Sequence, residues 1–388
     1  MEDYLKKGRK RVVFLTSTRA DFGKLKSLIL ALRKEPEFDV HVFATGMHML
    51  ADYGYTVNEI EKCRIPNIHK YISYSGQAPQ EAILASTIAG FGNYIKEFRP
   101  DLIVVHGDRL EALGGALAGS FNNIPVAHIE GGELSGTLDG HIRHAATKMS
   151  TLHFVSNQAA KARVRQLGEN PKNIFVIGSP EVDIILSKNL PTLAQAKKRY
   201  AVSYDRYAVL IYHPVTTELD ALPEQVAELT SAVTRSDINY LVIYPNNDPG
   251  GEVIRQYFQK QLSTNPRFRL FPSLRFEHFL AFLQNAYFII GNSSSAIREA
   301  PYFGVPTINV GTRQADRISN VASVLNHNNK QDEILATIQK FSGKKTRFKP
   351  VKTFGQGNSA KNFMKILKQK RIWQASTQKK FNDLNIVI

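Results

Sequence analysis

Short apolar runs alternate with longer amphipathic segments along almost the whole chain, and this alternation constrains the fold more than any other feature. The runs are nearly continuous in apolar residues and rich in Val and Ile, which is typical of strands buried on both faces of a parallel sheet. They predict strands at 11–17, 39–45, 101–107, 124–130, 152–156, 174–178, 207–213, 240–245, 287–292 and 306–311. The segments between them predict helices at 22–34, 79–97, 110–121, 140–149, 157–168, 218–234, 251–262, 276–285 and 294–303.

Strand–helix alternation on this scale predicts an α/β protein with doubly wound sheets. The rhythm is interrupted at 186–205, which is polar and basic. We therefore expect two Rossmann-like domains, at 1–186 and 187–360, and a C-terminal basic helix and tail at 361–388 that packs back on the first domain. Ligands bind beyond the carboxyl ends of the strands in such sheets, so two facing domains would form a deep interdomain cleft.

The composition favours a cytoplasmic globular protein. With a single cysteine, Cys63, the chain has no internal disulfide and no cysteine metal cluster. No apolar run approaches the roughly 18 residues that a membrane span needs. The N-terminal residues lead directly into a strand pattern and do not resemble a signal peptide.

The net charge of +16 raises the possibility of a nucleic-acid partner. Residues 341–388 hold twelve Lys and Arg and one acidic residue, Asp383, so +11 of this charge belongs to the C-terminal region. A solvated basic helix and an anionic partner both remain open for it. Because no DNA- or RNA-binding motif accompanies it, we expect no nucleic-acid partner.

In the first half, polar residues gather just after the strands. Arg19 follows the first strand, Asp21 is a candidate N-cap, and Gly23 would open a helix whose free N–H groups favour an anion. Asp108 and Arg109 are adjacent at a later strand-to-helix turn. Neither a dinucleotide fingerprint nor a Walker loop is present.

In the second half, the strand ends carry amide and hydroxyl groups. His213 and Asn246 each follow a strand. Ser293 and Ser294, in "GNSSSAIREA", offer hydroxyls and N–H groups at a helix start, which favours a nucleotide diphosphate. Glu299, further along that helix, is a candidate acceptor for ribose hydroxyls.

The stretch "HIEGGELSGTLDGHIRH", residues 128–144, combines three carboxylates with three histidines. By itself it fits a metal site, an acid–base site or a polar loop. His141 and His144 are spaced for one face of a helix, but the stretch lacks the HExxH pattern of a zinc site. We therefore expect no metal here.

Six segments together resemble a known family. They are "STRADFGKL", "HGDRLEAL", "HIEGGELSGTLDGHIRH", "HPVTTE", "GNSSSAIREAPYFGVPTINVGTRQ" and "GQGN". In this order they resemble the hydrolysing UDP-N-acetylglucosamine 2-epimerases of sialic acid biosynthesis, in their bacterial form without a kinase domain. The resemblance implies a GT-B-like fold without a cofactor, which converts UDP-N-acetylglucosamine and water into N-acetylmannosamine and UDP. The family reaction eliminates UDP to a 2-acetamidoglycal, which is then hydrated.

The resemblance also implies site residues. Removing a non-acidic C2 proton while a diphosphate leaves requires a carboxylate base on one side and a charge-stabilising group on the other. The catalytic residues carried over are Asp108, Glu133, Asp139 and His213. Glu130 is left with a structural role. The substrate and UDP residues carried over are Arg19, Gly23, His48, Arg109, Arg143, His144, Asp183, Asn246, Phe271, Phe276, Ser293, Ser294, Glu299 and Arg313.

Other interpretations stay open. The substrate could instead be UDP-2,4-diacetamido-2,4,6-trideoxyglucose, on a legionaminic acid pathway, although the loop "SGTLDG" is closer to the sialic acid branch. A GT-B glycosyltransferase would share the nucleotide site and need an acceptor. The relatives also suggest a homo-oligomer, a dimer or a tetramer.

Overall fold

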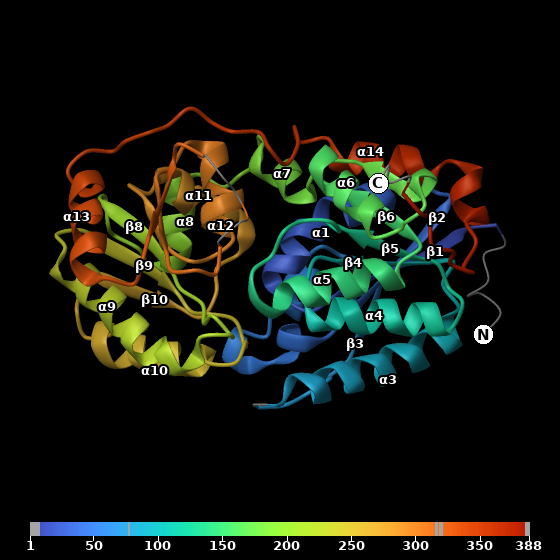
Figure 1. Cartoon of the computed structure of the whole chain (residues 1–388), viewed down its shortest axis with the longest axis horizontal. Helices are drawn as coiled ribbons and strands as arrows, with labels where there is room; N and C mark the ends of the chain where they lie inside the picture. Colours follow the sequence, from blue (N-terminus) through green and yellow to red (C-terminus); the bar gives the residue numbers. More distant parts are fainter. Residues whose placement is uncertain (1–7, 77, 315–316, 318–320, 385–388) are drawn as a thin grey trace. The chain divides into compact units, whose positions relative to one another are not determined.

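The computed structural model describes residues 8–76, 78–314, 317 and 321–384. The described chain divides into two compact units (Figure 1). The first comprises residues up to Glu133, then Asp139–Leu186, then Phe354 onward, and the second comprises Leu134–Leu138 and Ser187–Thr353. Together with the folds found in comparison below, this architecture confirms the prediction of two doubly wound α/β domains.

The first unit is built on a seven-stranded sheet in the order β3-β2-β1-β4-β5-β6-β7. All neighbouring strands pair in parallel. Its strands are β1 (Lys10–Thr16), β2 (Phe38–Ala44), β3 (Asn67–Lys70), β4 (Leu102–His106), β5 (Val126–Ile129), β6 (Leu152–Val155) and β7 (Ile174–Val176). The order of the strands reverses between β1 and β4, which is where such sheets bind ligands.

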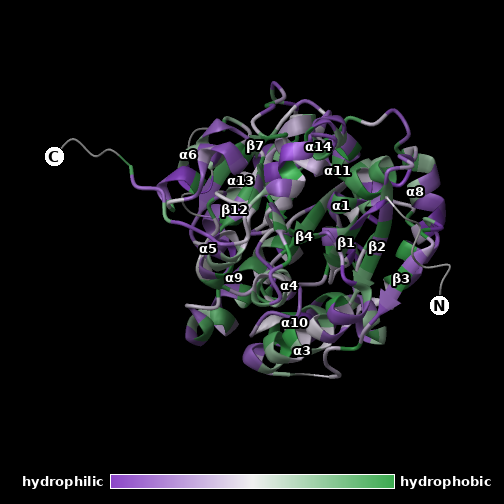
Figure 2. Ribbon diagram, turned by 90° about the vertical axis from the view of Figure 1, so that its right-hand side faces the viewer, coloured by the Kyte–Doolittle hydropathy of each residue, from purple (hydrophilic) through white to green (hydrophobic). Residues whose placement is uncertain are grey.

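Helices cover both faces of this sheet (Figure 1). Side chains of α1 (Arg19–Leu32) and α14 (Ser359–Leu367) pack on one face, and those of α3 (Gln80–Phe98) and α4 (Leu110–Phe121) on the other. The remaining helices are α2 (Val57–Glu61), α5 (Thr137–Met149), α6 (Gln158–Gln166) and α7 (Pro180–Ile185), with 3-10 turns at Gly46–Met49, Ala51–Tyr53, Pro171–Asn173 and Lys370–Gln374. Figure 2 shows hydrophobic residues concentrated in strands such as β4 and hydrophilic residues on α6 and α14.

The second unit repeats the plan with a six-stranded sheet in the order β10-β9-β8-β11-β12-β13, again parallel throughout. Its strands are β8 (Tyr207–Ile211), β9 (Asn239–Ile243), β10 (Phe268–Phe271), β11 (Ile289–Gly291), β12 (Thr307–Val310) and β13 (Val324–His327). Its helices are α8 (Leu193–Tyr200), α9 (Leu222–Arg235), α10 (Gly251–Leu262), α11 (Phe276–Asn285), α12 (Ser295–Arg298) and α13 (Gln331–Ser342), with 3-10 turns at Leu219–Ala221 and Ala300–Phe303. Here the order reverses between β8 and β11.

The backbone is tightly packed at this second reversal. Gly291 has φ of +122°, and a Cβ at this position would lie 1.9 Å from the Ile211 carbonyl oxygen. Only glycine fits such a conformation and such an approach. None of the helices in the described residues combines the length and the apolar character that spanning a membrane requires.

Candidate active site

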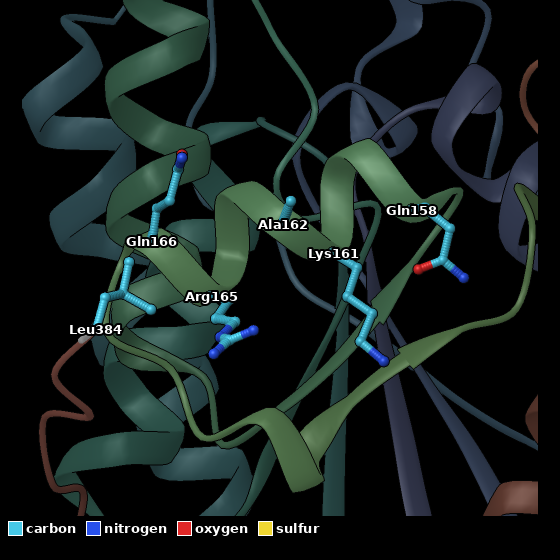
Figure 3. A pocket seen from close by; sticks show the side chains of 6 residues that line it. All are labelled: Gln158, Lys161, Ala162, Arg165, Gln166 and Leu384. Carbon is cyan, nitrogen blue, oxygen red and sulfur yellow. The ribbon is translucent and has the colours of Figure 1, made fainter. Parts of the chain in front are cut away.

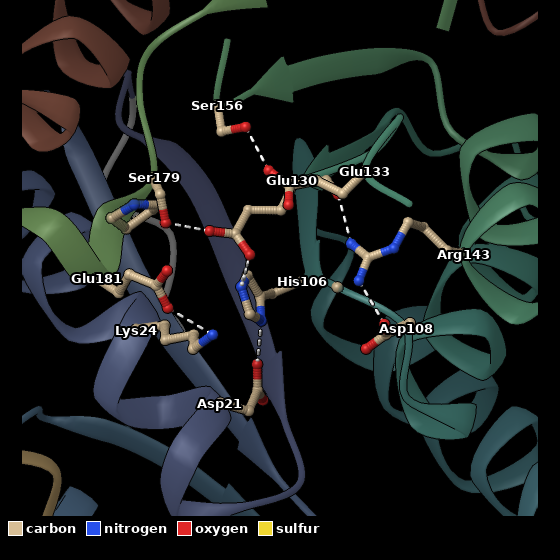
Figure 4. Close-up of polar contacts among 12 residues, drawn as sticks. Asp21, Lys24, His106, Asp108, Glu130, Glu133, Arg143, Ser156, Ser179 and Glu181 are labelled. Carbon is tan, nitrogen blue, oxygen red and sulfur yellow. Dashed lines mark hydrogen bonds and ion pairs between the residues drawn. The ribbon is translucent and has the colours of Figure 1, made fainter. Parts of the chain in front are cut away.

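A line of buried charged groups spans the reversal point of the first sheet (Figure 4). His106 is the last residue of β4, and its Nδ1 lies 2.8 Å from Oδ1 of Asp21, in the first turn of α1. Its Nε2 lies 3.2 Å from Oε2 of Glu130, which directly follows β5. All three side chains are buried. The carboxyl ends of β1, β4 and β5 are thereby joined by one imidazole.

His106 is held in its charged form. Burial alone would lower its pKa, but hydrogen bonds to Asp21 and Glu130 outweigh burial and raise the pKa to about 9. An imidazolium donates from both ring nitrogens, so both carboxylates accept. At neutral pH the ring of His106 therefore carries both protons and lies between two carboxylates.

Glu130 has a strained backbone. Its φ is +62°, in the left-handed region that a non-glycine residue rarely adopts. The second oxygen of its carboxylate accepts a hydrogen bond from the Ser179 hydroxyl. Because strain of this kind persists only where the surroundings enforce it, and concentrates at functional sites, Glu130 is a candidate functional residue.

Arg143 joins the ends of β4 and β5 (Figure 4). One guanidinium nitrogen donates to the Asp108 carboxylate and the other donates to the Glu130 carbonyl oxygen at 2.6 Å. Arg143 itself is 2% exposed and sits in the second turn of α5. The predicted residues Asp108 and Arg143 therefore lie in direct contact.

Glu133 and Asp139 are separated by five residues, of which the last two belong to α5. Glu133 is buried and accepts a hydrogen bond from the Ser156 hydroxyl, beyond β6. Asp139 is half-buried in the first turn of α5. Between them, residues 134–138 group with the second unit, where Ser135 Oγ accepts from Arg317 at 3.4 Å.

The start of α1 differs from the prediction. Thr18, and not Asp21, is the N-cap, because its hydroxyl accepts the Asp21 N–H at 3.1 Å. Asp21 Oδ2 in turn accepts the Ser17 N–H at 3.2 Å. Gly23 was expected to open the helix, but it is buried within α1, past the first turn, so its N–H is not one of the free donors of the helix start. Arg19 occupies that first turn and is half-buried.

His48 and Asp183 both make intramolecular contacts. His48 is fully buried, with Nε2 3.2 Å from Thr16 Oγ1 and Nδ1 2.7 Å from Thr56 Oγ1, and burial lowers its pKa to about 4. The carboxylate of Asp183 accepts the backbone N–H groups of Ser359 and Ala360, both at 2.8 Å. In this structure His48 is therefore a neutral core residue, and Asp183 caps α14.

An amide side chain occupies the reversal point of the second sheet. Asn292, directly after β11, accepts the His213 N–H at 2.7 Å and donates to the His213 carbonyl at 2.8 Å. The Asn246 N–H donates to His213 Nδ1 at 3.4 Å, which leaves the proton of the neutral ring on Nε2. His213 and Asn246, from neighbouring strand ends, are thus brought together.

The helix predicted at 294–303 is shorter than expected. It comprises α12, four residues long, and a 3-10 turn at Ala300–Phe303. Pro301 lacks the N–H that a continuous helix would need. Ser293 Oγ lies 2.9 Å from Ser295 Oγ, Ser294 is the N-cap residue, and the buried Glu299 is the C-cap. A diphosphate bound here would be held by hydroxyl and backbone N–H groups, and not by the dipole of a long helix.

The other predicted binding residues differ in their surroundings. Arg313 is buried and donates to the Asn292 carbonyl at 3.4 Å. Arg109 is the N-cap residue of α4, and its Nε lies 3.8 Å from Glu111. His144 is exposed on α5, with a pKa lowered by partial burial and by Arg143. Phe271 and Phe276 are buried, Phe271 against the Tyr200 ring and Phe276 against Phe279.

No group of three or more His, Cys, Asp or Glu in the described part of the chain could hold a metal ion. A pocket of about 360 Å³ lies on α6, and none of the predicted site residues is among those that line it (Figure 3). It is lined by Gln158, Lys161, Ala162, Arg165, Gln166 and Leu384.

The sequence interpretation missed His106 and the charged role of Glu130. Both were assigned to strands, yet each stands at the carboxyl end of its strand, in "VVHGD" and "AHIEGG". The same reasoning that selected Asp108 applies to them. The N-cap of α1 was also readable, because Thr18 is a preferred N-cap residue type and is followed three residues later by Asp21.

Comparison with known proteins identifies relatives along most of the chain. Residues 30–368 match the family model described as UDP-N-acetylglucosamine 2-epimerase. A UDP-N-acetylglucosamine 2-epimerase of Neisseria meningitidis serogroup B is 41% identical over 380 residues, covering 97% of this chain and all of the relative.

Two further relatives carry different names. The UDP-N,N'-diacetylbacillosamine 2-epimerase (hydrolyzing) of Legionella pneumophila is 33% identical and covers 92% of this chain and 96% of its own. The polysialic acid biosynthesis protein P7 of Escherichia coli is 35% identical, over 81% of this chain and 82% of its own. The fold matches a Neisseria meningitidis UDP-GlcNAc 2-epimerase bound to UDP-GlcNAc, with a TM-score of 0.77 and 18% identity, over 92% of this chain and 99% of that one.

Proposed function

This chain belongs to the UDP-N-acetylglucosamine 2-epimerase family, and we propose that it is a hydrolysing member that acts in sialic acid biosynthesis. It would convert UDP-N-acetylglucosamine and water into N-acetylmannosamine and UDP. The polysialic acid relative supports the pathway, and the hydrolyzing Legionella relative supports the reaction type. Family membership also argues against a glycosyltransferase.

The observation that carries the proposal is the contact of Arg143 with Asp108 and with the Glu130 carbonyl. Arg143 thereby ties the Asp108 carboxylate to the backbone of Glu130, and Asp139 precedes Arg143 by about one turn on the same helix. Elimination followed by hydration needs two or three carboxylates around one sugar ring. This set supplies them at the position where the fold places ligands.

In the elimination step, a carboxylate removes the C2 proton. The bond between C1 and the diphosphate oxygen breaks, its electron pair leaves with UDP, and a C1–C2 double bond forms. We assign this step to Asp108 with Glu133, and we add Glu130 because it belongs to the same buried line as His106. His213 would stabilise or protonate the departing diphosphate.

In the hydration step, water adds to C1 and a proton adds to C2. The proton adds on the face opposite to the one from which the C2 proton was removed, so that C2 is inverted. We assign this step to Asp139. We propose that the amide, hydroxyl and cationic groups of Asn246, Ser293, Ser294, Arg313, Arg19 and Arg109 hold the nucleotide, and that Glu299 accepts hydrogen bonds from its ribose hydroxyls. We propose Phe276 as the stacking partner of the uracil.

Proton NMR of the reaction in deuterated water tests the mechanism. We expect free N-acetylmannosamine with deuterium at C2, and UDP in equal amount. A product that keeps its C2 proton would contradict elimination. A product that stays attached to UDP would place the chain among non-hydrolysing epimerases.

UDP-N,N'-diacetylbacillosamine is the second candidate substrate, because the Legionella relative named for it covers nearly the whole chain. It is a 2,4-diacetamido-trideoxy sugar, so it differs from UDP-N-acetylglucosamine at C4 and C6. Incubation with each nucleotide sugar separately, followed by identification of the released product, decides between them. Turnover of the trideoxy sugar alone would overturn our choice.

We also propose a homo-oligomer in the cytoplasm. The single cysteine fits a reducing compartment. Light scattering after size-exclusion chromatography tests the oligomer, and a mass of one chain would exclude it.

A further inference from the structure

The basic C-terminal region is the feature of the sequence that the proposed reaction does not use. Beyond the 3-10 turn at Lys370–Gln374, residues 376–384 continue along the first unit. The Asn382 N–H donates to the Gly168 carbonyl at 2.9 Å, and a Cβ at Gly168 would lie 2.4 Å from the Phe381 ring. Leu384 lies beside Gln166 at the end of α6 (Figure 3). This segment is therefore docked on the protein.

Within this segment, the Lys379 ammonium group lies at the C-terminal end of α5. It donates to the carbonyl oxygens of Thr147, at 3.3 Å, and Ser150, at 2.8 Å, and also to that of Lys148. The last carbonyls of a helix have no partner within the helix, and the helix dipole makes this end favourable for a cation. Lys379 supplies both a donor and a positive charge to the end of α5.

A buried carboxylate holds Lys379 in place. Glu169 is 2% exposed, and its Oε2 lies 2.8 Å from Lys379 Nζ and 3.0 Å from His153 Nε2. Its Oε1 accepts from Lys148 at 2.7 Å. Although burial opposes ionisation, hydrogen bonds to His153, Lys148 and Lys379 lower the pKa of Glu169 to about 2. Glu169 is therefore a fixed anion around which the lysines are ordered.

The end of α5 is also connected to the turn that carries Asp108. Thr147 Oγ1 lies 3.0 Å from His128 Nδ1, and His128 Nε2 donates to the Gly107 carbonyl at 2.8 Å. Gly107 directly precedes Asp108. Toward the other end of α5 lie Asp139 and Arg143. The helix is thus held at one end by Lys379 and carries proposed site residues at the other.

We propose that Lys379 is a positioning residue, whose contacts with the end of α5 fix Arg143 and Asp139 relative to Asp108. The effect on turnover rests on the proposed function, because those side chains react or touch substrate only if the chain is an epimerase. The effect on α5 itself does not. In this proposal, Lys379 of the basic C-terminal region binds Glu169 and the last carbonyl groups of α5, which belong to its own chain.

The central variant is Lys379→Met, which keeps the length of the side chain and removes the ammonium group. Lys379→Arg keeps a charged donor and serves as the conservative rescue. Lys380→Met is the matched control, because Lys380 is the adjacent exposed lysine and its replacement removes the same net charge. Phe381→Ala, at a ring that is 66% exposed, loosens the docked segment without removing charge from it.

Hydrogen exchange measured by mass spectrometry on peptides covering 137–150 reports on α5 directly. We expect faster exchange in Lys379→Met, by about tenfold at the end of the helix, since that end loses its stabilising cation. Phe381→Ala should show a smaller increase. Lys379→Arg and Lys380→Met should match the wild type. Unchanged exchange in Lys379→Met, or an equal increase in Lys380→Met, would overturn the proposal.

Steady-state release of UDP from UDP-N-acetylglucosamine gives the second measurement. We expect kcat to fall about tenfold in Lys379→Met with little change in KM, because misplaced reacting groups affect the transition state more than binding. Recovery of kcat in Lys379→Arg is required. A kcat per folded molecule that is unchanged in Lys379→Met would reduce Lys379 to a stability role and overturn positioning. If the wild type does not release UDP, the proposed function fails, and hydrogen exchange still decides the role of Lys379.

Discussion

The two reversal points of the two sheets share a topology and differ in chemistry. Between β1 and β4, the buried groups are charged, with the His106 imidazolium between Asp21 and Glu130. Between β8 and β11, the bridging group is the neutral amide of Asn292, surrounded by serine hydroxyls and by Arg313. The first set is suited to holding a proton between carboxylates, and the second offers hydrogen-bond donors of the kind that bind an anion. The same fold thus supports two different tasks through the residues that follow its strands.

The largest effect should come from Asp108, at the charged reversal point. We expect Asp108→Asn to lower kcat by about 10³-fold or more, because it removes a carboxylate that we propose takes part in the reaction and weakens the ion pair with Arg143. The measurement is UDP release under saturating substrate. Asp52→Asn, at an exposed carboxylate, is the control and should leave kcat unchanged.

The next test separates the two glutamates of the same stretch. Glu130 belongs to the charged line and contacts His106, whereas Glu133 accepts a hydrogen bond from the Ser156 hydroxyl. We expect Glu130→Gln to lower kcat by about 10²-fold and Glu133→Gln by about tenfold. The reverse order would restore Glu133 as the principal carboxylate and Glu130 to a structural role.

At the neutral reversal point, His213→Asn should lower kcat by less, about 30-fold, since leaving-group stabilisation is shared with several donors. Because the backbone groups of His213 contact Asn292, the replacement preserves that pairing. With substrates that carry a better leaving group than UDP, kcat of the variant should come closer to kcat of the wild type. An undiminished loss with such substrates would argue against a role at the diphosphate.

The charge of His106 predicts a dependence of stability on pH. Its folded pKa of about 9 lies above the ordinary value of 6.5, so its contribution is fully present below pH 6.5 and is lost as the pH rises through about 9. The free energy of unfolding should fall by on the order of 2–3 kcal/mol between these values. Thermal unfolding of the wild type and of His106→Gln from pH 6.5 to 9.5 measures this. Equal slopes in the two proteins would contradict a charged His106.

The smallest effect is expected at Asp183, beyond the edge strand β7 and outside both reversal points. Because it caps α14, Asp183→Asn should lower the free energy of unfolding by about 1 kcal/mol and leave kcat unchanged. Denaturant unfolding and UDP release measure the two effects. A large loss of kcat would instead indicate that Asp183 contacts the substrate.

The sequence pattern predicted the central strands of both sheets and missed most of the edge strands. The strands that it missed are β3, β10 and β13, each four residues long and each at an edge of its sheet. Edge strands are covered on fewer sides, so "NIHK" and "VLNH" need no continuous apolar run. The alternation that revealed the other strands is therefore absent where burial is incomplete.

For the site, the sequence pattern identified residues that follow the strands, but it did not identify the side chains that they contact. Asp108, His213 and the serines after β11 were found because they follow apolar runs. The link from His106 to Asp21 joins residues 85 positions apart, and no local pattern encodes it. Whether a histidine such as His48 or His106 is neutral or charged depends on neighbours that only the folded chain provides.

The left-handed backbone at Glu130 has a consequence for engineering this chain. Glycine adopts φ of +62° without strain, so Glu130→Gly would relieve a local cost of about 1–3 kcal/mol while removing a carboxylate from the buried line. The same replacement would leave the buried His106 imidazolium with one carboxylate in place of two and the Ser179 hydroxyl without its acceptor. At position 130 the relief of backbone strain and the loss of buried hydrogen bonds therefore act on stability in opposite directions.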